Sequence, residues 1–373
     1  MIKVSKNDAF NNNFILKYKS LVRDFVLQEK SGFVFFHHSF EFNDLLNSDL
    51  IYHIAYDPFS SNGSSKCHSF LIDYQQISQF LLYGNSYLNI IKKQIKNRIG
   101  ADYRKVLLDE RKSIINNFNK NLILIKLGIN DPKIIKNESN FLEFHKKIKD
   151  KFNDNNKKIK KIFNYNEFLN SKENIRSEIL GNNKIKVCPY CNRQYIDTYS
   201  HQGKIKSIAQ IDHYFPKSIF PLYSLTLLNF IPSCSHCNCI IKKDKLFPWS
   251  PIYVDKLENQ KYFEINFNGT SGLYGDANSF KLEVTPKTKS ESNNSYFFRH
   301  QEIYKNHKED VSILLKKRQI FNDGYRNSIK TIIGNNMSDE EFKFMIFGVT
   351  GNDSDHLTNP LSKLKNDIVK GFE

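Results

Sequence analysis

The sequence predicts an α+β fold in which a small zinc-bound unit of two strands and a helix lies between two larger regions. Three observations lead to this prediction. Apolar residues recur at helical spacing through most of residues 1–186. Two Cys-x-x-Cys pairs fall within residues 187–250. Apolar and polar residues alternate in two short segments of residues 251–373, which predicts a β-hairpin, and helical patterns follow it.

Residues 1–186 are expected to be mostly helical, with a short strand at Phe33–Phe36. Three segments carry apolar residues every three or four positions, the spacing of one helix face: Phe14/Tyr18/Phe25, Leu88/Ile91/Ile95 and Phe144/Ile148/Phe152. The last segment also carries eight lysines between Lys146 and Lys161. They form either a stripe that faces DNA or a solvated helix face, and a run of charge is more often the latter.

Residues 251–373 are expected to hold the hairpin and then three helices. Strands are predicted at 263–267 and 280–284, where every second residue is apolar. The polar segment 286–295 is expected to be a flexible loop. One long amphipathic helix from Val311 to Ile332 follows, with shorter ones at 342–346 and 361–368.

The cysteines of the central unit have the spacing of a zinc site. Two Cys-x-x-Cys turns aim four thiolates at one tetrahedral ion, and soft thiolate ligands suit zinc. The expected ligands are Cys188, Cys191, Cys234 and Cys237. Disulfides or a thiol redox pair are the alternatives. The opening residues, Met-Ile-Lys-Val-Ser-Lys, lack the apolar segment of a signal peptide, so a reducing cytoplasmic location is expected.

Other residues of ligand type are less suited to this zinc site. Cys239 and His236 lie beside the second pair and are substitute ligands that fit a paired turn less well. Cys67 stands alone in the sequence. Histidines of the two flanking regions have no spacing typical of metal ligands, and we expect them to be hydrogen-bonded or exposed: His37, His38, His53, His300 and His307.

The segment between the cysteine pairs predicts two strands and a helix. A strand from Lys204 to Asp212 ends before Pro216, and a second strand from Leu225 to Ile231 is ended by Pro232. A short helix begins near Cys237, with Asn238 in its first turn.

Asp212 and His213 are the candidate catalytic residues. Imidazole titrates near neutral pH, which suits His213 to act as a general base. A carboxylate such as that of Asp212 binds hard cations, Mg²⁺ or Mn²⁺. Neighbouring strand residues point to opposite faces, so we expect the strand to end or bulge at this dipeptide.

The order of these features strongly resembles the HNH endonuclease family, the ββα-metal nucleases of the branch with four zinc cysteines. The resemblance covers about residues 187–248 and rests on both cysteine pairs, Asp212-His213, Pro216-Lys217-Ser218, Asn229, and Cys237-Asn238 followed by lysines. It implies that Asp212 and Asn238 bind the catalytic cation and that Asn229 orients the His213 ring. Asn229 and Asn238 are otherwise residues that bond the backbone or cap a helix.

Composition is consistent with a nucleic-acid partner. The 373 residues carry a net charge of +16 with a pI of about 9.3, which suits a polyanion. Abundant Lys, Asn, Ile, Phe and Tyr also fit an AT-rich coding bias, which weakens this inference. Lys217, Lys242 and Lys243 are candidate phosphate contacts or merely solvated charges. No apolar run reaches 18 residues, so no membrane partner is expected.

The predicted function is a DNA endonuclease with structural zinc and catalytic Mg²⁺ or Mn²⁺. The motif resembles bacterial HNH proteins of anti-phage defence, of Septu and retron type, and this resemblance implies a partner ATPase. A stand-alone restriction-like enzyme is the nearest variant, and charge alone does not separate DNA from RNA. The alternatives are a non-catalytic zinc-stabilised nucleic-acid-binding module, which needs neither Asp212 nor His213, and an assembly protein with a vestigial zinc unit.

Overall fold

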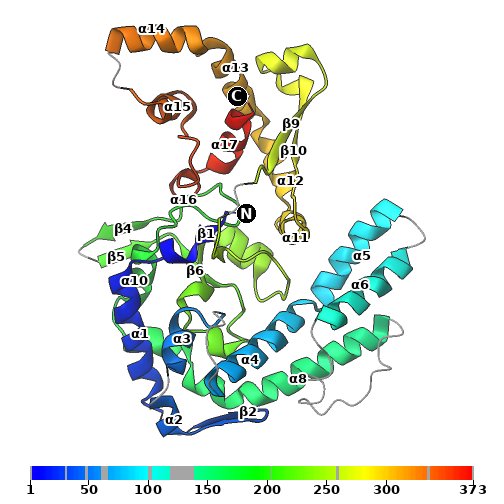
Figure 1. The fold of residues 1–373 in the computed structure, drawn as a ribbon, viewed down its shortest axis with the longest axis vertical. Helices are drawn as coiled ribbons and strands as arrows, with labels where there is room; N and C mark the ends of the chain where they lie inside the picture. The colour runs from blue at the N-terminus through cyan, green and yellow to red at the C-terminus, as the bar shows by residue number, and fades with distance from the viewer. Residues whose placement is uncertain are drawn as a thin grey trace.

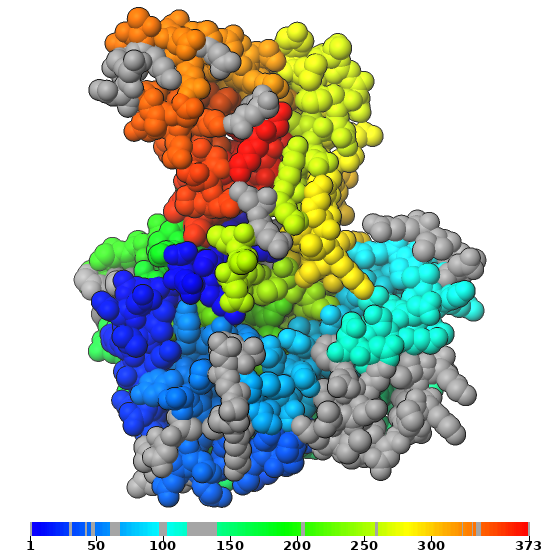
Figure 2. Space-filling view, in the orientation of Figure 1, coloured from blue at the N-terminus to red at the C-terminus, as the bar shows by residue number. Residues whose placement is uncertain are grey.

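A computed structural model describes residues 2–29, 32–46, 49–59, 66–99, 103–117, 138–202, 204–257, 260–333 and 337–371. The fold is mixed, with many helices and several two-stranded sheets. Figure 1 shows a lower part, built from the N-terminal helices around β6, and an upper part with β9, β10 and the C-terminal helices. Figure 2 shows that the upper part is joined to the lower one through a narrower neck. None of the described helices has the length and apolar character needed to cross a membrane.

The N-terminal region is mostly helical, as predicted. The apolar residues at helical spacing are buried in these helices, for example Phe14 and Tyr18 in α1 and Phe152 in α8. The described helices are α1 (Asn12–Val26), α2 (Phe42–Leu46), α3 (Leu50–Tyr56), α4 (Lys66–Leu82), α5 (Asn85–Ile99), α6 (Tyr103–Asn117), α8 (Glu138–Ile162), α9 (Tyr165–Ser171) and α10 (Ile175–Asn182). The expected strand is β2 (Phe33–Phe35), which forms an antiparallel hairpin with β3 (His38–Phe40).

The central region contains two antiparallel strand pairs. The pair β4 (Thr198–His201) and β5 (Lys204–Ser207) precedes the pair β6 (Gln210–His213) and β7 (Phe230–Ser233), in which Asp212 lies opposite Ile231. After β7 the chain forms a π-helix, η6 (His236–Lys242). The short strands β1 (Val4–Ser5) and β8 (Tyr253–Val254) pair in parallel and fix the N-terminus beside this region.

The C-terminal region has the predicted hairpin and helices. Strands β9 (Phe263–Phe267) and β10 (Phe280–Val284) are antiparallel, with Phe263 opposite Val284. The helices are α11 (Lys289–Phe297), α12 (His300–Tyr304), α13 (Lys308–Ile320), α14 (Asp323–Ile333), α15 (Asp339–Phe347), α16 (Asp355–Thr358) and α17 (Ser362–Lys370).

Buried apolar residues form two cores. The larger core runs from Val4 to Tyr253 and takes in Phe297 and Phe298 of the segment around α11. The second core lies in the upper part and runs from Tyr262 to Val369. The N-terminal helices and the cysteine-bearing unit therefore share one core, and the domain boundaries at 186/187 and 250/251 stay predictions.

Three expectations about single elements were wrong. Segment 286–295 is not a flexible loop, because Thr288 and Glu291 form a reciprocal capping box that begins α11. The long helix from Val311 to Ile332 is two helices, because α13 ends at Ile320 and α14 begins at Asp323. The side chain of Asn322 accepts a hydrogen bond from Tyr325 N and caps the start of α14. The strand expected from Lys204 to Asp212 is divided into β5 and β6.

The second strand of the central pair also differs from its prediction. Leu227–Asn229 form a 3₁₀ turn, and β7 begins only at Phe230. Pro232 lies inside β7 rather than ending it. Because β7 pairs only with β6 among the described strands, one of its edges needs no ladder donors, and proline is tolerated at such an edge.

Candidate metal centre and active site

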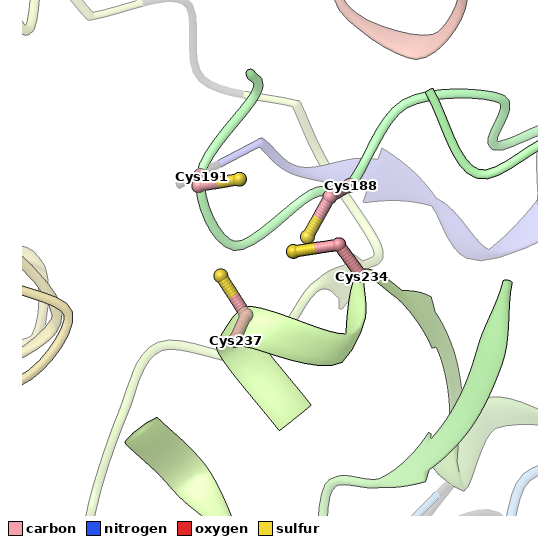
Figure 3. Close-up of side chains that lie close together, drawn as sticks. All are labelled: Cys188, Cys191, Cys234 and Cys237. Carbon is pink, nitrogen blue, oxygen red and sulfur yellow. The ribbon is translucent and has the colours of Figure 1, made fainter. Parts of the chain in front are cut away.

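Four cysteines meet where the chain enters and leaves the central strand pair. Cys188 and Cys191 lie on a tight turn, in which Asn192 N donates to Cys188 O at 2.7 Å. Cys234 follows β7, and Cys237 lies in η6. All four side chains are buried, and their sulfur atoms lie within 4.8 Å of one another. Figure 3 shows the four sulfurs converging on one point, so this cluster can hold a metal ion such as zinc.

Ionisation of the cluster also suits a metal ligand set. Burial raises the pKa of the Cys188 thiol. Hydrogen bonds from Cys188 and the other two cysteines lower the pKa of Cys234. A hydrogen bond with Cys188 also lowers the pKa of Cys191. Lowered pKa values at two of the four thiols favour deprotonation, which metal binding requires of its ligands. Cys239 is exposed and outside the cluster, and its thiol lies 2.9 Å from Gln210 Oε1. The side chain of Cys67 is outside the described residues.

The first cysteine turn is held by the C-terminal region. Tyr304 Oη donates to Cys191 O at 2.6 Å, and His300 Nε2 lies 2.8 Å from Tyr190 O. Asn192 accepts on its side chain from Lys363 N at 2.9 Å. The upper part of the molecule therefore fixes the geometry of the cysteine cluster, a role that no sequence pattern indicated.

Asp212 lies near the end of β6, close to the cysteine cluster. Its carboxylate accepts from Lys242 Nζ at 2.8 Å and from Tyr190 Oη at 2.5 Å. Burial raises the pKa of Asp212, and the Lys242 charge opposes that shift. Tyr190 stacks on Phe298 with ring centroids 4.7 Å apart. The Asp212 carboxyl group is therefore buried, and it is paired with the equally buried ammonium group of Lys242.

His213 is the last residue of β6, so the strand ends at the dipeptide as predicted. Its Nε2 lies 3.1 Å from Ser224 O, and its ring meets the edges of Tyr165 and Phe230 at centroid distances of 4.7 and 5.1 Å. Burial lowers the pKa of His213 to about 3. The side chain of His213 contacts different groups from the side chain of Asp212, which agrees with side chains on opposite faces of a strand.

The two asparagines contact neither His213 nor Asp212 through a side-chain hydrogen bond. Asn229 is fully buried, donates to Tyr223 O and Phe215 O, and accepts from Phe215 N at 2.7 Å. It thereby ties the loop after His213 to the start of β7. The Asn238 amide donates to Gln210 Oε1 at 3.1 Å.

The three candidate phosphate-contacting lysines lie in different surroundings. Lys242 is completely buried, with Nζ also 2.6 Å from His213 O. The turn that carries it is widened, because Lys243 N bonds to Asn238 O five residues back. Lys217 Nζ lies 4.1 Å from the Tyr165 ring centroid and donates to Asn166 Oδ1. Lys243 is exposed.

Sequence reasoning missed two residues at this site. Tyr190 lies between the first two cysteines and binds Asp212, and its place inside the Cys-x-x-Cys turn was an available signal. Tyr165 covers His213 from α9. It is far away in sequence, and no spacing pattern links it to His213.

A nearby cavity does not include the side chains of Asp212 and His213 in its lining. It encloses about 430 Å³ and is lined partly by aromatic residues, among them Tyr83, Tyr214, Phe215 and Trp249. Asp212 and His213 are not among its lining residues. The predicted catalytic side chains therefore lie outside this cavity.

Comparisons with known proteins do not place the chain in a family. A scan against protein-family models found no match, and searches of the curated proteins and of the solved structures found none either.

Proposed function

We propose that the protein is a divalent-metal-dependent endonuclease of the HNH type that hydrolyses phosphodiester bonds in DNA. One observation carries the proposal. The antiparallel pair β6–β7 and helix η6 are joined through the cysteine cluster, and Asp212-His213 lies at the end of the first strand. This arrangement, together with the resemblance in sequence, favours a nuclease in which zinc is structural.

His213 is the proposed general base. A neutral imidazole makes its bond to Ser224 O as a donor, so Nε2 carries the proton and Nδ1 is the basic nitrogen. This nitrogen takes the proton of the water that attacks phosphorus. With a pKa of about 3 the buried ring is unprotonated at neutral pH but a weak base. Contact with solvent when substrate binds returns the pKa toward its ordinary value of about 6.5.

Asp212 and Asn238 offer the donors for the catalytic cation. A carboxylate and an amide oxygen are ligand types that Mg²⁺ and Mn²⁺ accept. When bound, such an ion polarises the phosphate as a Lewis acid. Asp212 forms a salt bridge with Lys242, so the Lys242 ammonium group and the catalytic cation compete for the same carboxylate.

The described arrangement is the closed form of the proposed enzyme. Asp212 is 5% exposed and His213 is 6% exposed, which leaves no room for a phosphate. Tyr165 of α9 covers the imidazole, and Lys217 lies across Tyr165. Displacing α9 uncovers His213, so we propose that a partner acts on this helix. An ATPase of an anti-phage defence complex is the partner that the sequence resemblance suggests.

DNA binding is proposed to use the basic surface around η6. The chain carries a net charge of +16, and lysines that neutralise phosphates gain affinity by releasing counterions. Lys243 is exposed and directly follows η6, which makes it the proposed phosphate contact at this surface. Binding is then expected to weaken steeply with salt.

Cleavage of plasmid DNA tests the proposal. Purified protein is incubated with plasmid, with and without Mg²⁺ or Mn²⁺, and with the ATPase encoded beside it where the operon has one. We expect metal-dependent cleavage that His213→Ala abolishes, because the base is lost while the fold is kept. DNA binding and zinc content are measured on the same samples and are expected to change little.

A specific observation favours a second function, the non-catalytic zinc-stabilised binding module. Asp212 and His213 are buried, and the carboxylate is neutralised by Lys242 as in a structural ion pair. The same assay separates the two functions. Equal residual cleavage by wild type and His213→Ala, together with tight DNA binding by both, favours the binding module.

A further inference from the structure

A second group of metal-ligand side chains lies in the N-terminal region. His37 and His38 come from the β2–β3 hairpin, and Asp73 comes from α4. One potential ligand atom from each of the three lies within 4.8 Å of the others. Figure 1 shows β2 at the lower edge of the molecule, well away from the chain around β6. This trio is therefore distinct from the cysteine cluster and from Asp212.

The hairpin turn explains how adjacent histidines reach one carboxylate. Neighbouring residues of a regular strand point to opposite faces. Here β2 ends at Phe35 and β3 begins at His38, so His37 lies in the turn. Phe36 has a φ of 48°, a left-handed conformation that non-glycine residues seldom adopt. Its N–H donates to Asn155 Oδ1 of α8 at 2.9 Å, which holds the turn in place.

The distances within the trio fit coordination of one ion. His38 Nε2 lies 2.9 Å from Asp73 Oδ2, and His37 Nε2 lies 3.4 Å from the same oxygen. Tetrahedral zinc with bonds of about 2.0–2.1 Å separates neighbouring ligand atoms by about 3.3–3.4 Å. The trio thus needs only small shifts to admit an ion.

The trio is buried on the side of His38 and open to solvent on the side of His37. The His38 side chain is 5% exposed and packs against Phe40 and Phe70, whereas that of His37 is 44% exposed. A buried imidazole and carboxylate offer fixed ligands, and the exposed imidazole lies where an ion enters from solvent.

We propose that His37, His38 and Asp73 bind a divalent transition-metal ion of the zinc class. Two imidazoles and one carboxylate are ligands that suit Zn²⁺, and a three-residue set leaves a fourth position for water. The bound ion clamps the hairpin to α4. The proposal is independent of the proposed nuclease function and requires no cleavage activity. The adjacent histidines alone have no ligand spacing in sequence, and the third ligand comes only from the fold.

Zinc stoichiometry tests the proposal. Tag-free protein with its cysteine cluster loaded is dialysed against buffered free Zn²⁺, and metal and protein are then measured. We expect two zinc ions per chain for the wild type and one for both His37→Gln and Asp73→Asn. His53→Gln, which changes an exposed histidine of α3, is the matched control and keeps two. Because His37 lies at the rim, its variant is expected to fold normally, which circular dichroism checks.

Cobalt distinguishes the two sites by their spectra. Co²⁺ bound to cysteines shows thiolate charge-transfer bands, and Co²⁺ on imidazole and carboxylate does not. The second equivalent of Co²⁺ is therefore expected to add only weak visible bands in the wild type and none in Asp73→Asn. A wild type that stops at one zinc per chain overturns the proposal. Two zinc ions per chain in both His37→Gln and Asp73→Asn overturn it equally.

Discussion

Lys242 links the cysteine unit to the acidic residue of the proposed active site. Its ammonium is fully buried between Asp212 Oδ1 and His213 O, and it lies 5.3 Å from the Trp249 ring centroid. A buried charge is tolerated only when its partner stays in place. Lys242 therefore has a structural role that the lysine run alone did not distinguish from phosphate binding.

Replacing Lys242 tests how the carboxylate is balanced. Lys242→Met leaves Asp212 without its cationic partner, and breaking a buried pair costs about 3–5 kcal/mol of unfolding free energy. We expect a loss of this order in urea unfolding at neutral pH. If Asp212 is a cation site, Mn²⁺ restores part of the loss in Lys242→Met and little in Asp212→Asn/Lys242→Met.

Lys243→Met is the matched control for that measurement, since Lys243 is the exposed neighbour. It is expected to unfold like the wild type. An unchanged stability of Lys242→Met would contradict the structural role of the ion pair. Destabilisation without rescue by Mn²⁺ would leave the ion pair in place but count against the cation site.

At the scale of elements, the cysteine cluster joins three segments that also contribute buried residues to the larger core. It connects the turn at 188–191, the end of β7 and the start of η6. Structural zinc supplies folding free energy, with apparent binding energies of about 10–16 kcal/mol in zinc-finger peptides. Removal of the ion is therefore expected to loosen β6–β7 and η6 together.

Cys188→Ser tests the cluster directly. We expect loss of the bound zinc and a large fall in the urea midpoint, because three thiolates hold the ion less tightly and a buried hydroxyl replaces a ligand. Cys239→Ser is the control, since this cysteine is exposed and outside the cluster. A zinc-free Cys188→Ser protein with wild-type stability would show that the cluster is not a structural metal site.

Sequence patterns predicted strands and the cysteine cluster well where the residues involved lie close together in the sequence. Strict alternation in Phe263/Ile265/Phe267 predicted β9, and the paired cysteine spacing predicted the cluster. The capping residues Thr288 and Glu291 were present but overlooked, so α11 was missed. Tyr165 over His213 and Asp73 beside His37 depend on packing between distant segments, which no local pattern encodes.

At the scale of the whole molecule, buried histidines make stability depend on pH. Burial lowers the pKa of each of them to about 3 or 4: His145, His213, His300 and His356. In the unfolded chain an imidazole has a pKa of about 6.5. Between these values the unfolded state binds more protons than the folded state, so acid favours unfolding.

Urea unfolding between pH 7 and pH 5 measures this effect. The stabilisation from neutral burial is fully present above about pH 6.5 and is lost progressively below it, by up to about 1.4 kcal/mol per pH unit for each histidine. His145→Gln can still donate to Leu81 O but does not titrate, so we expect its slope to be smaller by about one proton. A slope equal to that of the wild type would show that His145 is protonated in the folded state.

The bonds from the C-terminal region to the first cysteine turn bear on biosynthesis. Cys188 to Asn192 leave the ribosome long before residues 300, 304 and 363, which complete their hydrogen bonding. A nascent or prematurely terminated chain thus lacks the hydrogen bonds that hold this turn. We expect such chains to bind zinc more loosely than the full-length protein, because the hydrogen bonds that hold Tyr190, Cys191 and Asn192 are missing.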